Sequence, residues 1–220
     1  MLENITYSRL LLSRCVIFDL DGTLCDTIGD IERSLVATFE RCDFPVPNMS
    51  RLRVGPPLSD MIRNLVGQDI DKSFIDNLAA SYREDYESSD YGVSPLYSGA
   101  FELLVRLKSA GKKLGIATLK REASTMRLVD CKEIRAFFDT IFCCDSRSRL
   151  YTKDQMLATI IDELDILPSD AIFLGDSAND IEAGQKNGIP TVAVLFGYGD
   201  PEDLIAAKPN YICENYTELI

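Results

Sequence analysis

The sequence predicts an α/β protein in which an all-helical domain is inserted into a doubly wound parallel sheet. A short apolar, β-branched run at residues 16–18 has the composition of a buried strand in such a sheet. No strand pattern interrupts residues 26–91, and from residue 98 onward strands alternate with helices. We therefore expect a core domain formed by residues 1–24 and 95–220, and a helical domain formed by residues 25–94.

The inserted domain is predicted from three apolar faces that repeat at the spacing of an amphipathic helix. These faces fall at residues 28–39, 58–65 and 74–86. A proline-rich stretch at residues 44–47 interrupts the chain after the first helix. Residues 88–98 contain a glycine and a proline and have the composition of the linker that returns to the core.

The core domain is predicted from its alternation of strands and helices. A helix is expected at residues 100–107, because Gly111 stands where a helix C-cap belongs. Thr152 and Gln155 form the pattern of a capping box, which opens another helix. The remaining elements are expected at residues 112–118, 121–130, 140–143, 171–175, 178–187 and 191–195, with a sixth strand at an edge of the sheet at residues 211–213. This alternation implies right-handed crossovers and a Rossmann-like sheet.

Charge and composition exclude several classes of protein. The chain has 35 acidic and 23 basic residues, and its net charge of −12 argues against nucleic acid or an anionic membrane as a partner. It contains no histidine, which excludes Ser-His-Asp and Cys-His catalysis and histidine-based metal sites. Its seven cysteines lack the spacing of a metal site, its start does not resemble a signal peptide, and its apolar runs are too short to span a bilayer. We therefore expect a cytoplasmic protein with reduced thiols.

Polar side chains follow the ends of several predicted strands. Asp19 and Asp21 follow the first strand, and because they are two residues apart in an extended chain, we expect them to lie side by side. Open α/β sheets bind their ligands at the carboxyl ends of the strands. The other polar residues at or near these ends are Thr118, Lys153, Asp176 and Asp180. The sequence therefore predicts that these side chains converge on one edge of the sheet.

Each of these residues also has an ordinary structural explanation. Thr118 suits a strand because it is β-branched, and most lysines, such as Lys153, are solvated. Asp176 and Asp180 suit the positive end of a helix dipole. Four carboxylates at one buried edge nevertheless repel one another unless they share a proton or bind a cation. Mg²⁺, a hard cation that prefers oxygen ligands, fits such a cluster best.

Together these residues resemble the four sequence motifs of the haloacid dehalogenase-like phosphatase superfamily. The matching segments are, in order, Asp19-Leu20-Asp21-Gly22-Thr23, Thr118, Lys153 and Gly175-Asp176-x-x-x-Asp180. Within the superfamily, the chain is most similar to the phosphoglycolate phosphatase-like group, which carries a helical cap after the first motif. Leu119 and Asp154 depart from the pattern, since many relatives have a small polar residue and a proline at these places. Lys120 is the alternative to Lys153 as the lysine of the third motif.

The resemblance implies a Mg²⁺-dependent phosphatase that acts on a small phosphorylated metabolite. Asp19 would attack phosphorus and form an aspartyl-phosphate, while Asp21 would protonate the leaving oxygen and then activate water. Thr118 and Lys153 would bind the phosphoryl oxygens. The metal ligands would be Asp19, the main-chain carbonyl of Asp21, Asp176 and Asp180. The substrate site would also include Gly22, Leu119 and, from the cap, Arg53.

Other functions fit parts of the same pattern. A phosphosugar mutase of the superfamily would share Asp21 and the cap, and a pyrophosphatase or a nucleotidase would share the whole site. A phospho-receiver domain also combines acidic residues, a hydroxyl and a lysine, but the helical insert and the segment Asp21-Gly22-Thr23 argue against it. A non-catalytic, partner-binding relative would not need every catalytic position to be filled. The expected assembly is a monomer or a homodimer.

Overall fold

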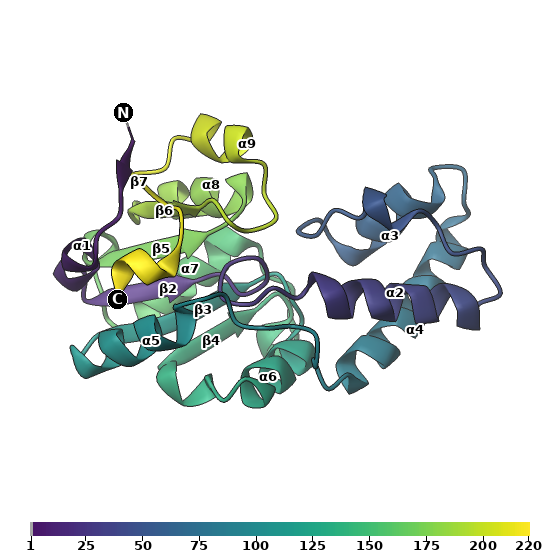
Figure 1. Ribbon diagram of the computed structural model, residues 1–220, viewed down its shortest axis with the longest axis horizontal. Coiled ribbons are helices and arrows are strands. Elements are labelled where there is room, and N and C mark those ends of the chain that lie inside the picture. Colours follow the sequence, from purple (N-terminus) through teal and green to yellow (C-terminus); the bar gives the residue numbers. More distant parts are fainter. Residues whose placement is uncertain (1) are drawn as a thin grey trace. The chain divides into compact units, whose positions relative to one another are not determined.

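The computed structural model describes residues 2–220 (Figure 1). The chain up to Asp26, together with Leu96–Ile220, forms one compact unit, which we call the core unit. Thr27–Pro95 forms a second compact unit, which we call the helical unit. None of the described helices combines the length and the apolar character that a membrane crossing requires.

The core unit is built on a parallel sheet. In the described part of the chain its seven strands are β1 (Glu3–Asn4), β2 (Cys15–Phe18), β3 (Lys113–Thr118), β4 (Thr140–Cys143), β5 (Ala171–Gly175), β6 (Thr191–Val194) and β7 (Tyr211–Cys213). Their order across the sheet is β1-β7-β6-β5-β2-β3-β4, and all neighbours run parallel. The predicted α/β class with a parallel sheet is therefore confirmed.

The structure corrects the prediction at one edge of the sheet. Strand β7 is predicted as the edge strand, but the two residues of β1 pair with Tyr211 and Ile212, so β7 has a neighbour on each side. A strand of two residues is too short to show alternation, which explains why β1 is absent from the prediction. Helices α1 (Tyr7–Leu12) and α9 (Pro201–Ala206) are also absent from it, because six residues make less than two turns.

Helices cover both faces of the sheet. The described helices of the core unit, besides α1 and α9, are α5 (Ala100–Ser109), α6 (Glu122–Cys131), α7 (Lys153–Glu163) and α8 (Ala178–Lys186). Crossovers toward β4 run through α5 and α6, whereas those toward β7 run through α7, α8 and α9. Because parallel crossovers are right-handed, the two directions place their helices on opposite faces.

Side-chain packing in the core agrees with this arrangement. Ile17 and Phe173, which are register partners on β2 and β5, pack in one buried cluster with Leu157 and Ile160 of α7 and with Ala183 of α8. Residues that alternate with them, such as Val16 and Ile172, therefore face the other side of the sheet. Both kinds of position are apolar and buried, which is why the strands read as continuous apolar runs.

The helical unit consists of α2 (Ile28–Arg41), α3 (Leu58–Val66), α4 (Lys72–Ser88) and the 3₁₀ turn η1 (Met49–Arg51). Helix α4 contacts both α2 and α3. Its buried face includes Ile75 and Leu78, and that of α2 includes Leu35 and Phe39. The ring of Phe44, in the proline-rich break, lies 5.9 Å from that of Phe39 and 5.5 Å from that of Phe74.

Replacing a buried leucine of α5 should destabilise the core unit. The change Leu104→Ala removes a fully buried side chain and should lower the free energy of unfolding by about 2–5 kcal/mol. Leu150→Ala is the matched control, because Leu150 is 79% exposed; its effect should stay within about 0.5 kcal/mol. Urea unfolding followed by circular dichroism would measure both, and equal effects would contradict the described packing.

Candidate active site

The sheet places three of the predicted residues at the ends of neighbouring strands. Strand β2 lies between β3 and β5, and Asp19 directly follows it. The main-chain N–H of Asp19 donates to the carbonyl of Leu174 at 2.9 Å, which continues the ladder to β5. Thr118 is the last residue of β3, and Asp176 directly follows β5. The predicted convergence therefore comes from strand order, with Asp19 in the middle.

Lys153 connects two of the carboxylates. It is the first residue of α7, which opens with the capping box formed by Thr152 and Gln155. Its Nζ lies 2.7 Å from Oδ1 of Asp19 and 2.9 Å from Oδ1 of Asp180, and it donates to the carbonyl of Ala117 at 3.0 Å. Burial acts to lower the pKa of this lysine, but the charges of Asp180 and Asp19 outweigh burial and hold the pKa above its ordinary value. Lys153 is thus a buried cation held by its anionic partners.

Asp19, Asp176 and Asp180 form a buried cluster in which one carboxylate oxygen from each lies within 4.8 Å of the others. Asp176 is held by two donors: the Thr23 hydroxyl at 3.2 Å to Oδ1, and the main-chain N–H of Tyr198 at 2.7 Å to Oδ2. These bonds fix the orientation of Asp176 toward the end of β2.

Asp180 belongs to the first turn of α8, where it forms a reciprocal cap with Ser177. The Ser177 hydroxyl and main-chain N–H donate to Oδ2 of Asp180 at 2.6 and 3.1 Å, and the main-chain N–H of Asp180 donates back to the hydroxyl at 3.2 Å. Oδ2 is therefore used in starting the helix, while Oδ1 faces Lys153. Asp180 therefore both caps its helix and takes part in the site.

The acidic cluster carries more negative charge than its lysine can balance. The pKa of Asp19 is raised to about 8, mainly by burial; the charge of Lys153 opposes this shift, and the charges of Asp180 and Asp176 add to it. Burial and the charge of Asp180 likewise raise the pKa of Asp176 to about 6. Carboxylate oxygens are the ligands that Mg²⁺ prefers, and a divalent cation would offset the surplus charge. The side chains present therefore fit a hard divalent cation.

Asp21 contacts a different lysine. Nζ of Lys120 lies 3.0 Å from Oδ1 and 3.2 Å from Oδ2 of Asp21. The sequence gives Lys120 as the alternative to Lys153, and in the structure Lys153 contacts Asp19 while Lys120 contacts Asp21. The main-chain N–H of Lys120 also donates to the Thr118 hydroxyl at 3.1 Å, so this hydroxyl accepts one bond and its O–H proton can be donated to a ligand.

The remaining predicted residues have different surroundings. Gly22 has a φ of +78° and lies so close to the Asp176 carboxylate and the Tyr198 ring that a Cβ would overlap both. The Leu119 side chain is 39% exposed. Arg53 belongs to the helical unit, where its exposed guanidinium donates to the main-chain carbonyls of Ser50 at 3.3 Å and Leu52 at 2.9 Å. The substrate-binding roles of these residues stay predictions.

Sequence reasoning missed several supporting contacts. Tyr198 holds Asp176 through its main chain, which no side-chain pattern can reveal, and its hydroxyl donates to Asp26 at 3.0 Å. The two glycines that flank it offered a signal, since a Cβ at Gly197 or Gly199 would overlap atoms of Asp176. The pairing of Lys120 with Asp21 has a weaker signal, namely that Lys120 stands two residues beyond the strand-end hydroxyl.

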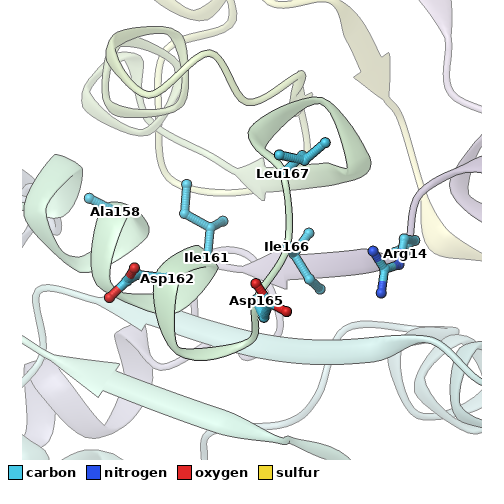
Figure 2. A pocket seen from close by; sticks show the side chains of 7 residues that line it. All are labelled: Arg14, Ala158, Ile161, Asp162, Asp165, Ile166 and Leu167. Carbon is cyan, nitrogen blue, oxygen red and sulfur yellow. The ribbon is translucent and has the colours of Figure 1, made fainter.

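A surface pocket lies elsewhere in the core unit (Figure 2). Its lining residues are Arg14, Ala158, Ile161, Asp162, Asp165, Ile166 and Leu167. Arg14 directly precedes β2, whereas Asp19 directly follows it, so the pocket is at the amino end of that strand. None of the predicted site residues lines it.

Comparison with known proteins shows the family to which the chain belongs. A family model described as haloacid dehalogenase-like hydrolase matches residues 16–194, which include each of the predicted core residues from Asp19 to Asp180. This chain belongs to the haloacid dehalogenase-like hydrolases. The resemblance read from the motifs is therefore confirmed at the level of the superfamily.

The proteins to which this chain is similar carry different names. The chain is 31% identical over 187 residues to the tyrosine-protein kinase PtkA of Mycobacterium tuberculosis. The matched region covers 84% of this chain but only 62% of PtkA. It is 30% identical to the pyrophosphatase PpaX of Bacillus velezensis, covering 93% of this chain and 94% of PpaX. A solved structure described as a predicted phosphatase from Clostridium acetobutylicum superposes with a TM-score of 0.82 at 30% identity, covering 94% of this chain and 96% of that one.

A methyl group at Gly22 should damage the site more than backbone strain alone. Gly111 provides the control, because its φ of +74° matches that of Gly22 but no atom lies within 4 Å of its added Cβ. Gly111→Ala should therefore lower the free energy of unfolding by about 1–2 kcal/mol through strain alone. Gly22→Ala should lose a further 1–3 kcal/mol, roughly, through overlap with Asp176. Urea unfolding would measure the difference, and equal losses would contradict the close approach.

Proposed function

We propose that this protein is a Mg²⁺-dependent phosphatase that hydrolyses a small phosphomonoester through a phospho-Asp19 intermediate. One observation carries the proposal: two aspartates two residues apart are each paired with their own lysine. Lys153 contacts Asp19 within the acidic cluster, and Lys120 contacts Asp21 outside it. This separation suits two different tasks, a nucleophile beside a cation site and an acid–base group beside the leaving oxygen.

The proposed reaction has two steps. In the first, a carboxylate oxygen of Asp19 bonds to phosphorus, the bond from phosphorus to the leaving oxygen breaks, and Asp21 donates its proton to that oxygen. In the second, Asp21 takes a proton from water as the water oxygen bonds to phosphorus, and the bond from phosphorus to Asp19 breaks. Inorganic phosphate leaves and Asp19 is restored. Asp21 thus serves once as an acid and once as a base.

The other residues of the site would bind and neutralise the transferring group. Lys153 holds Asp19 in place and offers positive charge, and the Thr118 hydroxyl donates to a phosphoryl oxygen. Asp19, Asp176, Asp180 and the main-chain carbonyl of Asp21 would hold Mg²⁺. When bound, the metal would neutralise charge that develops on the phosphoryl oxygens. Local positive charge of this kind is needed because the chain as a whole carries a net charge of −12.

We propose a small phosphorylated metabolite of the phosphoglycolate type as the substrate, with the helical unit acting as the cap that selects it. Inorganic pyrophosphate is the second candidate, because relatives named pyrophosphatase PpaX match 93% of this chain over nearly their full length. A phosphosugar mutase would use the same side chains but return the phosphoryl group to a sugar instead of water. Release of inorganic phosphate separates these reactions.

Hydrolysis of a panel of phosphate compounds would test the proposal. The panel includes phosphoglycolate, pyrophosphate, a nucleotide and a sugar phosphate, each with Mg²⁺ and with EDTA. We expect release of inorganic phosphate only with the metal, and a fall of roughly a thousandfold or more in Asp19→Asn, because the nucleophile is lost. The best substrate in the panel indicates the substrate class.

Asp162→Asn is the matched control for this experiment, because Asp162 is an exposed aspartate of the surface pocket. Its activity should equal that of the unmodified protein. Turnover that survives in Asp19→Asn would show that another residue is the nucleophile. Turnover that is equal with EDTA would remove the metal from the proposal.

A contribution of Arg53 to substrate binding would appear in the Michaelis constant. Arg53→Ala should raise KM by about 10-fold or more, with little change in kcat, for substrates that carry a second anionic group, because a charged hydrogen bond is lost. Arg51→Ala, an exposed arginine two residues away, is the control. An unchanged KM for every substrate would show that Arg53 is only a surface residue.

A further inference from the structure

Lys120 makes an unusually complete contact with Asp21. Its Nζ lies 3.0 and 3.2 Å from the two carboxylate oxygens, so both are engaged at once. The lysine side chain is only 7% exposed and the aspartate side chain 17% exposed. A lysine withdrawn from water to this extent is uncommon and is stabilised by its ionic partner. The contact therefore restricts the rotation of Asp21 about its side-chain bonds.

A main-chain hydrogen bond holds the segment that carries Lys120. Lys120 follows β3 by two residues, and its main-chain N–H donates to the Thr118 hydroxyl at 3.1 Å. This bond fixes the chain where it leaves the strand and so directs the lysine side chain. The main chain that carries the Lys120 side chain is therefore held at the end of β3.

The other buried lysine of the site is already committed elsewhere. The ammonium of Lys153 contacts Asp19, Asp180 and the carbonyl of Ala117. Lys153 is therefore engaged on the nucleophile, and Lys120 is the cation that engages Asp21. Asp21 lies two residues after Asp19 in the first motif, and its carboxylate contacts a different lysine.

We propose that Lys120 is a positioning residue, which aims the Asp21 carboxylate at the leaving oxygen and then at the attacking water. The inference rests on the proposed function, in which Asp21 is the acid–base group. In this role Lys120 acts through Asp21. Proton transfer requires a separation close to that of a hydrogen bond, so loss of the aiming contact lowers the rate although Asp21 is still present.

A double-mutant cycle tests whether Lys120 acts through Asp21. The four proteins are the unmodified chain, Lys120→Met, Asp21→Asn and the double variant, assayed with the best substrate of the panel and Mg²⁺. Lys120→Met should lower kcat by about 10–100-fold with KM nearly unchanged. In the Asp21→Asn background, the same change should lower kcat by less than about 2-fold, because the group that Lys120 positions no longer transfers a proton.

The dependence of activity on the leaving group provides a second test, because a general structural defect would lower activity on all substrates alike. Substrates with basic, alkyl-type leaving oxygens need protonation more than aryl phosphates do. Lys120→Met should therefore lose most activity on alkyl phosphates and least on nitrophenyl phosphate, with the same trend as Asp21→Asn. Lys120→Arg, which keeps the positive charge, should recover part of the lost kcat.

Lys113→Met is the matched control, because Lys113 pairs with Asp139 at 3.2 Å at the opposite end of the same strand. It should leave kcat and its leaving-group trend unchanged. Circular dichroism melting checks that each variant is folded, and if Lys120→Met is not, Lys120→Arg and Lys120→Gln take its place in the cycle.

The outcomes separate the inference from the function on which it rests. Equal losses from Lys120→Met in both backgrounds, a change confined to KM, or a uniform loss across all leaving groups would overturn the positioning role. If the unmodified chain shows no metal-dependent turnover, or if Asp19→Asn retains it, the proposed function itself fails. A functional enzyme with an additive cycle would remove the role of Lys120 alone.

Discussion

The buried ammonium group of Lys153 is the interaction on which the rest of the candidate site depends. It lies between the carboxylates of Asp19 and Asp180, which come from a strand end and from the first turn of a helix. Without it, buried like charges would face one another across a region of low dielectric, which is strongly unfavourable. With it, the cluster still holds a surplus of carboxylates over ammonium groups, and burial together with the charges of neighbouring carboxylates raises the pKa values of Asp19 and Asp176. The same surplus suits a divalent cation.

The position of this ammonium follows from the topology of the sheet. Strand β2 lies between β3 and β5, so Asp19 has the ends of both neighbours beside it. Helices α7 and α8 contact each other on one face, and each starts next to the site, which brings Lys153 and Asp180 together. Ordinary parallel crossovers therefore suffice to bring together residues that are more than a hundred positions apart in the sequence.

Much of this arrangement could be predicted because it depends on local patterns. Apolar runs that end on Asp19, Thr118 and Gly175 locate the strand ends, and the rule for open sheets places those ends together. The contacts that hold the carboxylates could not be predicted in the same way. The main-chain N–H of Tyr198 is signalled only by the two glycines that flank it, and local patterns do not show which aspartate Lys120 and Lys153 each contact. Very short elements such as β1 also lack a periodic pattern.

The central position of β2 affects how the protein folds during its synthesis. This strand ends at Phe18, yet its neighbours β3 and β5 begin only at Lys113 and Ala171. A ribosome would therefore release an apolar strand whose partners emerge much later, and the unpaired strand would be open to aggregation or to chaperone binding. The helical unit is synthesised during this interval and is compact by itself, so it can fold before the sheet is complete. Completion of the sheet, and of the acidic cluster with it, waits for the last third of the chain.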